Sequence, residues 1–254
     1  MPLITFTSDY GSNDHYVAAV KAKLLHADPG TNLVDISHDI PPQDIAQGAF
    51  ILRNTYQDFP LGTIHLIAVD TTSALKNRFI VARINHHIFI APDNGILSII
   101  IDQKPDELVL ISENIKDSFP GKNIMADAAV KLYQGYSFNV IGKNTEDYKI
   151  IKEREVSFGE DKISGHVLYI DHYGNAITNI TKKIFQSLQK TRSYTITFKR
   201  EHINSIHSTY NEVAEADCLV LFNSDGFLEI AINQGSAYQL LGLRYDDSVN
   251  IIFQ

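Results

Sequence analysis

The chain has 254 residues, 44% of them hydrophobic and 20% charged, a composition typical of a globular protein with one large domain or two ordinary ones. Its formal net charge of -8 at pH 7 argues against a broad nucleic-acid surface, and no basic cluster alternates with aromatic residues. The apolar runs are far shorter than the roughly 20 residues that cross a bilayer. The lone cysteine, Cys218, excludes an intrachain disulfide, and the opening residues lack the pattern of a secretory signal peptide. We therefore expect a cytoplasmic protein that binds neither nucleic acid nor membrane.

Short β-branched runs alternate with amphipathic stretches through the first half of the chain, a rhythm typical of strands and crossover helices in an α/β sheet. The predicted strands are Leu3-Phe6, Asn32-Ile36, Ile64-Val69, Phe79-Arg83, His87-Ala91 and Glu107-Ile111. The predicted helices are Asp14-Ala27, Ile45-Phe59 and Ile124-Gln134. This half, residues 1–145, is predicted to be an α/β domain with a central sheet flanked by helices.

The pattern changes after residue 145, where residues 146–163 form a charged, weakly apolar stretch that we interpret as a linker. Short apolar runs separated by Gly, Asn and Asp turns follow it. The strands predicted there are Gly165-Ile170, Ser193-Phe198, Cys218-Phe222, Leu228-Ile232 and Val249-Phe253. Residues 164–254 are thus predicted to be an all-β domain.

Two acidic residues, Asp9 and Asp14, lie in a Gly-containing loop between the first predicted strand and helix, at the usual ligand-binding edge of an α/β sheet. A carboxylate there can accept two hydrogen bonds at once, which suits a vicinal ribose diol, or it can cap the helix without any ligand. We expect Asp14 to be the cap. Asp9 is left either to bind a ligand or to shape the turn.

A second polar string, residues 35–44, follows the second predicted strand and contains His38 and Asp39. A metal site built from these two residues with Asp9 and Asp14 is conceivable, but no spacing here is as diagnostic as a His-Glu-x-x-His helix, and we predict no metal. Further polar strings stand at Asp70, at residues 91–95, at residues 171–175 and at residues 223–226. The last three are equally compatible with plain turns.

Taken together, these strings resemble one family over nearly the whole chain, the S-adenosylmethionine (SAM) hydroxide adenosyltransferases, or SAM hydrolases, which are related to the SAM-dependent fluorinase and chlorinase. The matching strings are Thr7-Ser8-Asp9-Tyr10-Gly11, Asp35-Ile36-Ser37-His38-Asp39, Pro92-Asp93-Asn94-Gly95, Asp171-His172-Tyr173-Gly174-Asn175 and Asn223-Ser224-Asp225-Gly226. The resemblance implies an N-terminal α/β domain and a C-terminal β-barrel. It also implies a homotrimer with sites between subunits, SAM as substrate and no cofactor.

The resemblance implies roles for individual residues as well. The implied substrate-binding residues are Asp9 for the ribose hydroxyls, Asp171 and Ser224 for the two ends of methionine, Asn175 for the adenine side, and Tyr10 and Phe50 for the wall of the site. The implied reaction is an in-line displacement in which water attacks the ribose 5′ carbon and methionine leaves, giving adenosine and L-methionine.

The chain departs from the family where the attacking water is bound. The family places an Asp, an Arg and a His there, and the Asp corresponds to Asp70. Where a pair of arginines is expected the chain has Asn77 and Arg78, and where the His is expected it has Pro120. The candidate catalytic residues are therefore Asp70, Asn77, Arg78 and Lys122, with Lys76 as a further helper. Alternatives to the hydrolase are a halide nucleophile in the same site and a catalytically silent SAM- or adenosine-binding protein.

Overall fold

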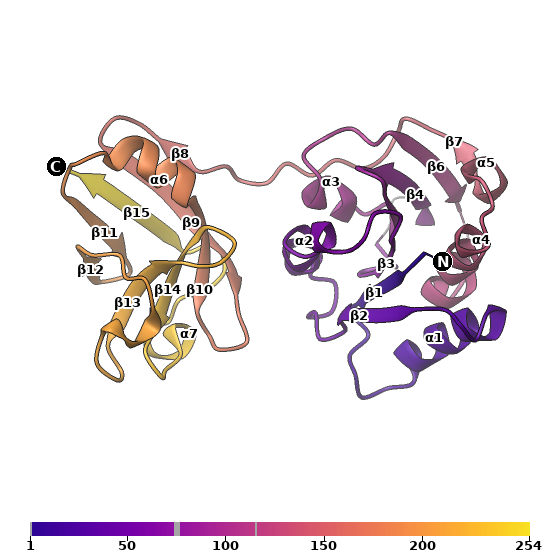
Figure 1. Ribbon diagram of the computed structural model, residues 1–254, viewed down its shortest axis with the longest axis horizontal. Helices are drawn as coiled ribbons and strands as arrows, with labels where there is room; N and C mark the ends of the chain where they lie inside the picture. Colours follow the sequence, from indigo (N-terminus) through magenta and orange to yellow (C-terminus); the bar gives the residue numbers. More distant parts are fainter. Residues whose placement is uncertain (1, 74–76, 115) are drawn as a thin grey trace. The chain divides into compact units, whose positions relative to one another are not determined.

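The computed structural model describes residues 2–73, 77–114 and 116–254. The chain folds into two compact units, Met1–Glu153 and Arg154–Gln254, and the division falls inside the segment predicted as a linker (Figure 1). Within the described ranges, no helix has the length and apolar character needed to cross a membrane.

The first unit is built on a mixed sheet with the strand order β2-β1-β3-β5-β4-β6-β7. Its strands are β1 (Ile4–Ser8), β2 (Leu33–Ser37), β3 (Ile64–Ala68), β4 (Phe79–Ile84), β5 (His87–Pro92), β6 (Glu107–Ser112) and β7 (Lys143–Asn144). β1 pairs in parallel with both β2 and β3, and β3 pairs in parallel with β5, whereas β4, β6 and β7 join through antiparallel pairs. The carboxyl ends of β1 and β3 therefore lie side by side.

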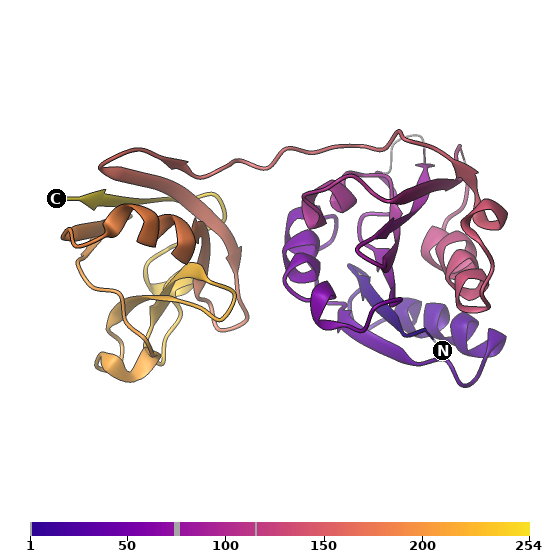
Figure 2. The ribbon, with the colours of Figure 1, turned by 45° about the horizontal axis from the view of Figure 1, so that its top comes forward.

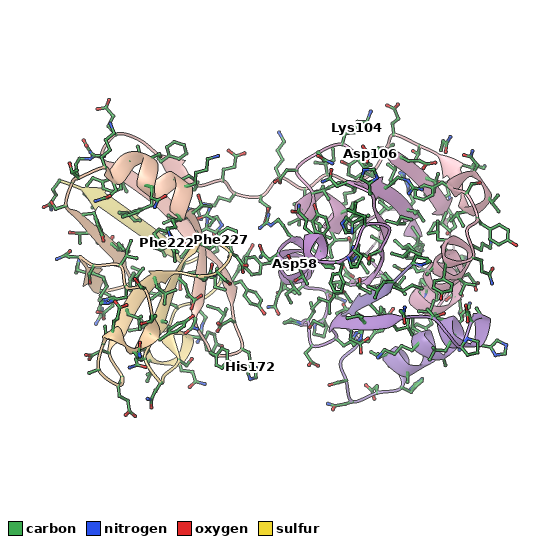
Figure 3. All side chains as sticks on the ribbon, in the orientation of Figure 1. Asp58, Lys104, Asp106, His172, Phe222 and Phe227 are labelled. Carbon is green, nitrogen blue, oxygen red and sulfur yellow. The ribbon has the colours of Figure 1, made fainter. Side chains whose placement is uncertain are left out.

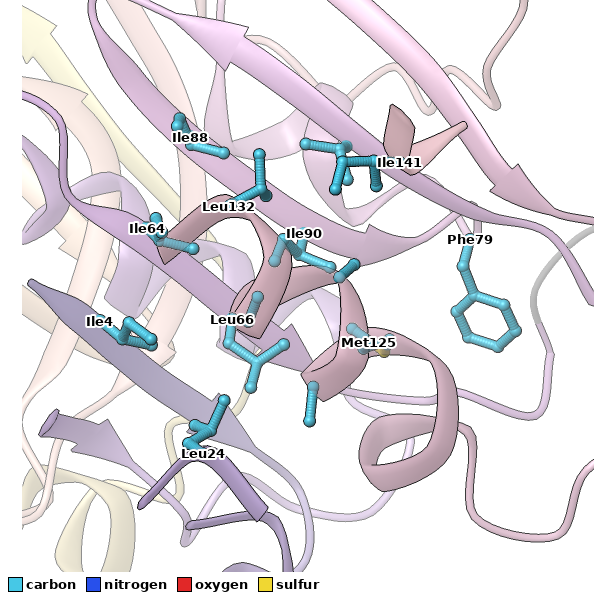
Figure 4. Packing of buried hydrophobic residues seen from close by; sticks show 14 of the residues in the cluster. Ile4, Leu24, Ile64, Leu66, Phe79, Ile88, Ile90, Met125, Leu132 and Ile141 are labelled. Carbon is cyan, nitrogen blue, oxygen red and sulfur yellow. The ribbon is translucent and has the colours of Figure 1, made fainter. Parts of the chain in front are cut away.

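Helices cover both faces of this sheet (Figures 1 and 2). They are α1 (Tyr16–Ala27), α2 (Ile45–Arg53), α3 (Ile96–Ile100), α4 (Ala126–Tyr133) and α5 (Phe138–Ile141), together with the short turns η1 (Tyr56–Asp58) and η3 (Gly121–Met125), the latter π-helical. Successive strand residues point to opposite faces. Leu66 accordingly packs in one cluster with Leu24 of α1 and Leu132 of α4 (Figure 4). Ile67 packs in a second cluster with Leu52 of α2, on the other face.

Several predicted helix limits differ from the observed ones. The helix predicted over residues 45–59 ends at Arg53, because the side chains of Asn54 and Thr55 turn back to the carbonyls of Phe50 (2.9 Å) and Ile51 (2.6 Å) and compete with the backbone ladder. α3 was not predicted, since its short, continuous apolar run is equally typical of a buried strand.

The predicted capping role of Asp14 is wrong. α1 begins at Tyr16, its N-cap position is His15, and no side chain caps it.

The second unit is an antiparallel, barrel-like sheet with the order β12-β11-β15-β9-β10-β14-β13, and β8 pairs with β9. Its strands are β8 (Ser157–Phe158), β9 (Lys162–Ile170), β10 (Ala176–Thr181), β11 (Tyr194–Phe198), β12 (Glu201–Ile203), β13 (Cys218–Phe222), β14 (Phe227–Ile232) and β15 (Ser248–Phe253). The helices are α6 (Lys182–Gln189) and α7 (Ala237–Leu240), with a 3-10 turn η4 (Tyr210–Glu212). A bridge between His207, which follows β12, and Leu221 of β13 brings the two ends of the sheet together. The predicted fold class, an α/β unit followed by a β-barrel unit, is confirmed.

Candidate functional site

Asp9 and Asp70 are neighbours because they follow paired parallel strands. The register places Ser8 of β1 opposite Ala68 of β3, and Asp9 and Asp70 come just after these residues. The Asp9 carboxylate accepts hydrogen bonds at one oxygen, Oδ2, from the main-chain N–H groups of Asp70 (3.0 Å) and Gln43 (2.9 Å). Its other oxygen, Oδ1, has no hydrogen-bond partner among the residues that the structure describes. Asp9 is thus held rigidly with one acceptor atom left for a ligand.

Asp70 is buried and adopts a left-handed backbone conformation, with φ of 48°. The Asn94 side chain holds this strained residue by donating to the carbonyls of Val69 (2.9 Å) and Asp70 (3.1 Å). The Asp70 carboxylate accepts hydrogen bonds from Ser73, at its N–H (3.3 Å) and its hydroxyl, and from the Thr72 hydroxyl (3.4 Å). Backbone strain that is held by specific hydrogen-bond partners often occurs at functional positions, so Asp70 stays a candidate catalytic residue.

The wall residues predicted from the resemblance both belong to the first unit. Tyr10 packs its ring edge-on against Phe119, with centroids 5.6 Å apart, and burial together with the charge of Asp9 raises the pKa of its phenol. Phe50 is buried in α2.

The other catalytic candidates occupy different environments. Arg78 is 7% exposed, and its guanidinium binds the Asp147 carboxylate (2.8 Å), the Asp147 carbonyl (2.8 Å) and the Asp93 carboxylate (3.3 Å). Asn77 is exposed with φ of 49°. Lys122 is half-buried in η3 and forms no ion pair within the described ranges. Lys76 lies outside the described residues.

The residues considered for a metal are engaged elsewhere. His38 shares a hydrogen bond with the Ser8 hydroxyl (2.7 Å) and contacts the Asp35 carboxylate (3.1 Å), while Asp39 accepts a hydrogen bond from Ser12 (3.1 Å). Over the residues that can be described, no group of His, Cys, Asp and Glu side chains has the arrangement of a metal site.

In the second unit, Asp171 and Asn175 form one turn between β9 and β10. The two Asp171 carboxylate oxygens accept hydrogen bonds from the Asn175 main chain (2.8 Å) and side chain (3.0 Å). Figure 3 shows His172 at the tip of this connection. Ser224 is exposed in the turn between β13 and β14, and Asn223 shapes that turn by accepting hydrogen bonds from the N–H groups of Asp225 (3.1 Å) and Phe227 (3.0 Å).

Two residues near this turn were missed by sequence reasoning. Glu229, 3% exposed on β14, accepts a hydrogen bond from the Tyr210 hydroxyl (2.7 Å). Burial raises the pKa of the Glu229 carboxyl, and the nearby charges of Asp171 and Asp225 raise it further. The only sequence signal was an acid within an otherwise apolar strand, Phe-Leu-Glu-Ile-Ala-Ile.

A cleft of about 560 Å³ lies beside these residues in the second unit, lined by Tyr173, Asn175, Tyr210, Ile232, Gln234 and Gly235. Aromatic walls with amide side chains at the edge suit a flat heteroaromatic ring that carries donors and acceptors. A cleft of similar size in the first unit is lined by charged residues near β6, among them Lys104 and Asp106, and contains none of the candidate residues (Figure 3).

The first unit thus carries acids at the ends of parallel strands, and the second carries a cleft with aromatic walls and amide side chains at its edge. Residues 4–142 match the SAM hydroxide adenosyltransferase N-terminal domain, and residues 165–250 match the SAM hydroxide adenosyltransferase C-terminal domain. The chain therefore belongs to the SAM hydroxide adenosyltransferase family, as its sequence motifs predicted.

Individual proteins are similar to this chain over nearly their full length. The (R)-S-adenosyl-L-methionine hydrolase of Thermus thermophilus is 28% identical over 98% of this chain and 99% of its own. A fluorinase of Nocardia brasiliensis is 24% identical over 98% of this chain and 96% of its own. The crystal structure of an uncharacterized conserved protein from Thermotoga maritima superimposes with a TM-score of 0.89 at 28% identity, covering 98% of this chain and all of that one.

Proposed function

We propose that the protein binds SAM and displaces methionine from its ribose 5′ carbon with water, giving adenosine and L-methionine. The observation that carries the proposal is the pair Asp9 and Asp70 at one sheet edge, the first with a free acceptor oxygen and the second held in a strained conformation. Family membership supplies the substrate class.

Asp9 is suited to the ribose because its orientation is fixed before any ligand binds. Two main-chain amides hold Oδ2, so Oδ1 can accept a hydrogen bond from a ribose hydroxyl without a further loss of side-chain freedom. In the second unit, Asn175 lines the aromatic cleft and is the proposed contact on the adenine side. Asp171 and Ser224 are the proposed contacts of the methionine ammonium and carboxylate.

The proposed chemistry is a single displacement. The water oxygen forms a bond to the 5′ carbon, the bond from that carbon to sulfur breaks, and its electron pair stays on methionine, which leaves as a neutral thioether. No general acid is needed, because the leaving group takes up no proton. No redox cofactor is needed, because the displacement requires no external oxidant or reductant. Asp70 is the proposed acceptor of the proton that water loses, and positioning of the two reactants supplies much of the rate enhancement.

Assembly and location are part of the same proposal. The family resemblance implies a homotrimer with sites between subunits, and the single cysteine of the chain favours a reducing, cytoplasmic location. Light scattering coupled to gel filtration tests the first: a mass of three chains supports it, and a monomer contradicts it.

Activity is tested by incubating the purified protein with SAM and separating adenosine and methionine by chromatography. Asp70→Asn should abolish turnover and spare SAM affinity, whereas Asp9→Asn should weaken SAM binding in calorimetry. Asp14→Asn is the matched control, because Asp14 is an exposed acid of the same loop as Asp9. SAM binding without adenosine formation would overturn the hydrolase, and a 5′-halo-adenosine formed only with added halide would assign the site to a halide nucleophile.

A further inference from the structure

The hydroxyl of Tyr10 is buried without a hydrogen bond. Tyr10 directly follows Asp9, and its ring is packed against Phe6, Tyr16 and Phe119. Its Oη atom is inaccessible to solvent and has no partner among the described residues. Buried tyrosine hydroxyls usually have a hydrogen-bond partner, because an unpaired buried polar group destabilises the fold.

The hydroxyl points to the edge of the sheet that carries the candidate catalytic acid. A Cβ atom built on Gly121 would lie 2.2 Å from Tyr10 Oη and 3.4 Å from the Cβ of Ala68, so the hydroxyl occupies the space that a side chain at Gly121 would take. Ala68 ends β3 and precedes Asp70 by two residues. Thr71, also buried, follows Asp70 and approaches Tyr10 without forming a hydrogen bond of normal geometry.

Packing does not account for this hydroxyl. A phenylalanine would keep the same ring contacts and would leave no unpaired polar atom. The neighbouring residues on the η3 side, Pro120 and Gly121, carry no polar side-chain atom, so neither side chain can pair with Tyr10 or act on a ligand. The Tyr10 hydroxyl is a polar side-chain group presented on this side, and a bound molecule would satisfy it.

The protonation state of the Tyr10 hydroxyl determines whether it acts as a hydrogen-bond donor or as a base. Burial and the neighbouring Asp9 charge raise the pKa of the Tyr10 phenol, which therefore stays protonated near neutral pH. A protonated phenol donates one hydrogen bond to an electron-rich atom and cannot serve as a base.

We propose that Tyr10 is a catalytic residue whose hydroxyl donates a hydrogen bond to the attacking water, and this inference rests on the proposed function. One lone pair of the water oxygen accepts the Tyr10 O–H, and another attacks the 5′ carbon. One water proton passes to Asp70 as the oxygen–carbon bond forms and the carbon–sulfur bond breaks. The hydrogen bond from Tyr10 strengthens as the oxygen gains hydroxide character, so it stabilises the transition state more than the bound substrate.

The test is Tyr10→Phe, which removes one oxygen atom. We expect kcat to fall at least tenfold, the KM for SAM to stay within about twofold, and Tm to be unchanged or higher, since an unpaired buried hydroxyl is lost. Tyr16→Phe is the matched control because it removes a hydroxyl from an exposed residue (41%) of the same aromatic group, and it should leave kcat unchanged.

Three outcomes of these measurements would overturn the proposed role of Tyr10. A Tyr10→Phe protein with the kcat of the unmodified protein overturns the proposal while leaving the proposed function intact. A lower Tm together with a lower kcat assigns the hydroxyl a structural role and also overturns it. If the unmodified protein forms no adenosine from SAM, the proposed function fails and this inference fails with it.

Discussion

Replacing Arg78 by Met separates a structural role of this residue from a catalytic one. Met preserves most of the length of the side chain and removes the guanidinium. That group binds Asp147 at 2.8 Å and Asp93 at 3.3 Å, and Asp93 is 1% exposed. The variant therefore leaves a buried Asp93 carboxylate without its cation.

The two ion pairs contribute unequally. The Asp147 side chain is 81% exposed, and a pair with an exposed partner contributes about 0–1 kcal/mol. Breaking a buried pair costs about 3–5 kcal/mol, and we expect the lower end here because Asp93 can take up a proton. A loss of about 3 kcal/mol lowers Tm by roughly 6–12 °C in a protein of this size.

The loss should also depend on pH. Burial already raises the pKa of Asp93, and removing Arg78 raises it further. A carboxyl whose folded pKa lies above its unfolded pKa favours the folded state once it is protonated, so the deficit should be larger at pH 8 than at pH 5.

Thermal unfolding followed by circular dichroism, together with SAM turnover below the transition, provides the assay. Arg83→Met on the same strand is the control. The Arg83–Glu107 pair is exposed (39% and 41%), and the Arg83 guanidinium lies 4.7 Å from the centre of the Phe138 ring, so the variant should cost about 1–2 kcal/mol, less than Arg78→Met. An Arg78→Met protein with the Tm of the unmodified protein and no turnover would refute the reasoning and make Arg78 catalytic.

Three further predictions concern buried groups. Burial lowers the pKa of His65 from 6.5 to about 3, so the contribution of His65 to the free energy of unfolding should be constant above pH 6.5 and fall as the pH drops below it, by about 2 kcal/mol at pH 5. His65→Gln should remove this contribution, so urea titrations of the two proteins should differ in their pH slope by about that amount, and equal slopes would contradict the prediction. Gly121→Ala should lower Tm by crowding the Tyr10 hydroxyl, and less so in a Tyr10→Phe background; equal losses in both backgrounds would contradict the contact. Glu229→Gln keeps an acceptor for the Tyr210 hydroxyl and removes a buried carboxyl whose pKa is raised, so Tm should rise more at pH 8 than at pH 5. An equal change of Tm at both pH values would contradict the raised pKa of Glu229.

Sequence patterns predicted the elements that are long and regular. Strands β1 to β6 of the first sheet were found because apolar runs bounded by polar turns are typical of strands, whereas the two-residue β7 was not predicted. The end of α2 was missed because side-chain bonds from Asn54 and Thr55, rather than a change of periodicity, terminate the helix.

The residues of the candidate site also differ in how far the sequence could place them. Asp9 and Asp70 could be placed together because parallel neighbouring strands bring their carboxyl ends to one edge. Arg78 could not be assigned a partner, since Asp147 lies 69 residues along the chain.

By itself, the sequence determined the family, the two-unit fold and the acids at the strand ends, because these depend on local periodicity and short ordered motifs. Only the tertiary structure decided which polar groups are paired. It engages Arg78 in a buried ion pair, joins Glu229 to Tyr210 and leaves the Tyr10 hydroxyl buried beside Gly121 without a partner in the described part of the chain. Burial and hydrogen-bond partners arise from contacts between distant segments, and no local pattern of residue types specifies them.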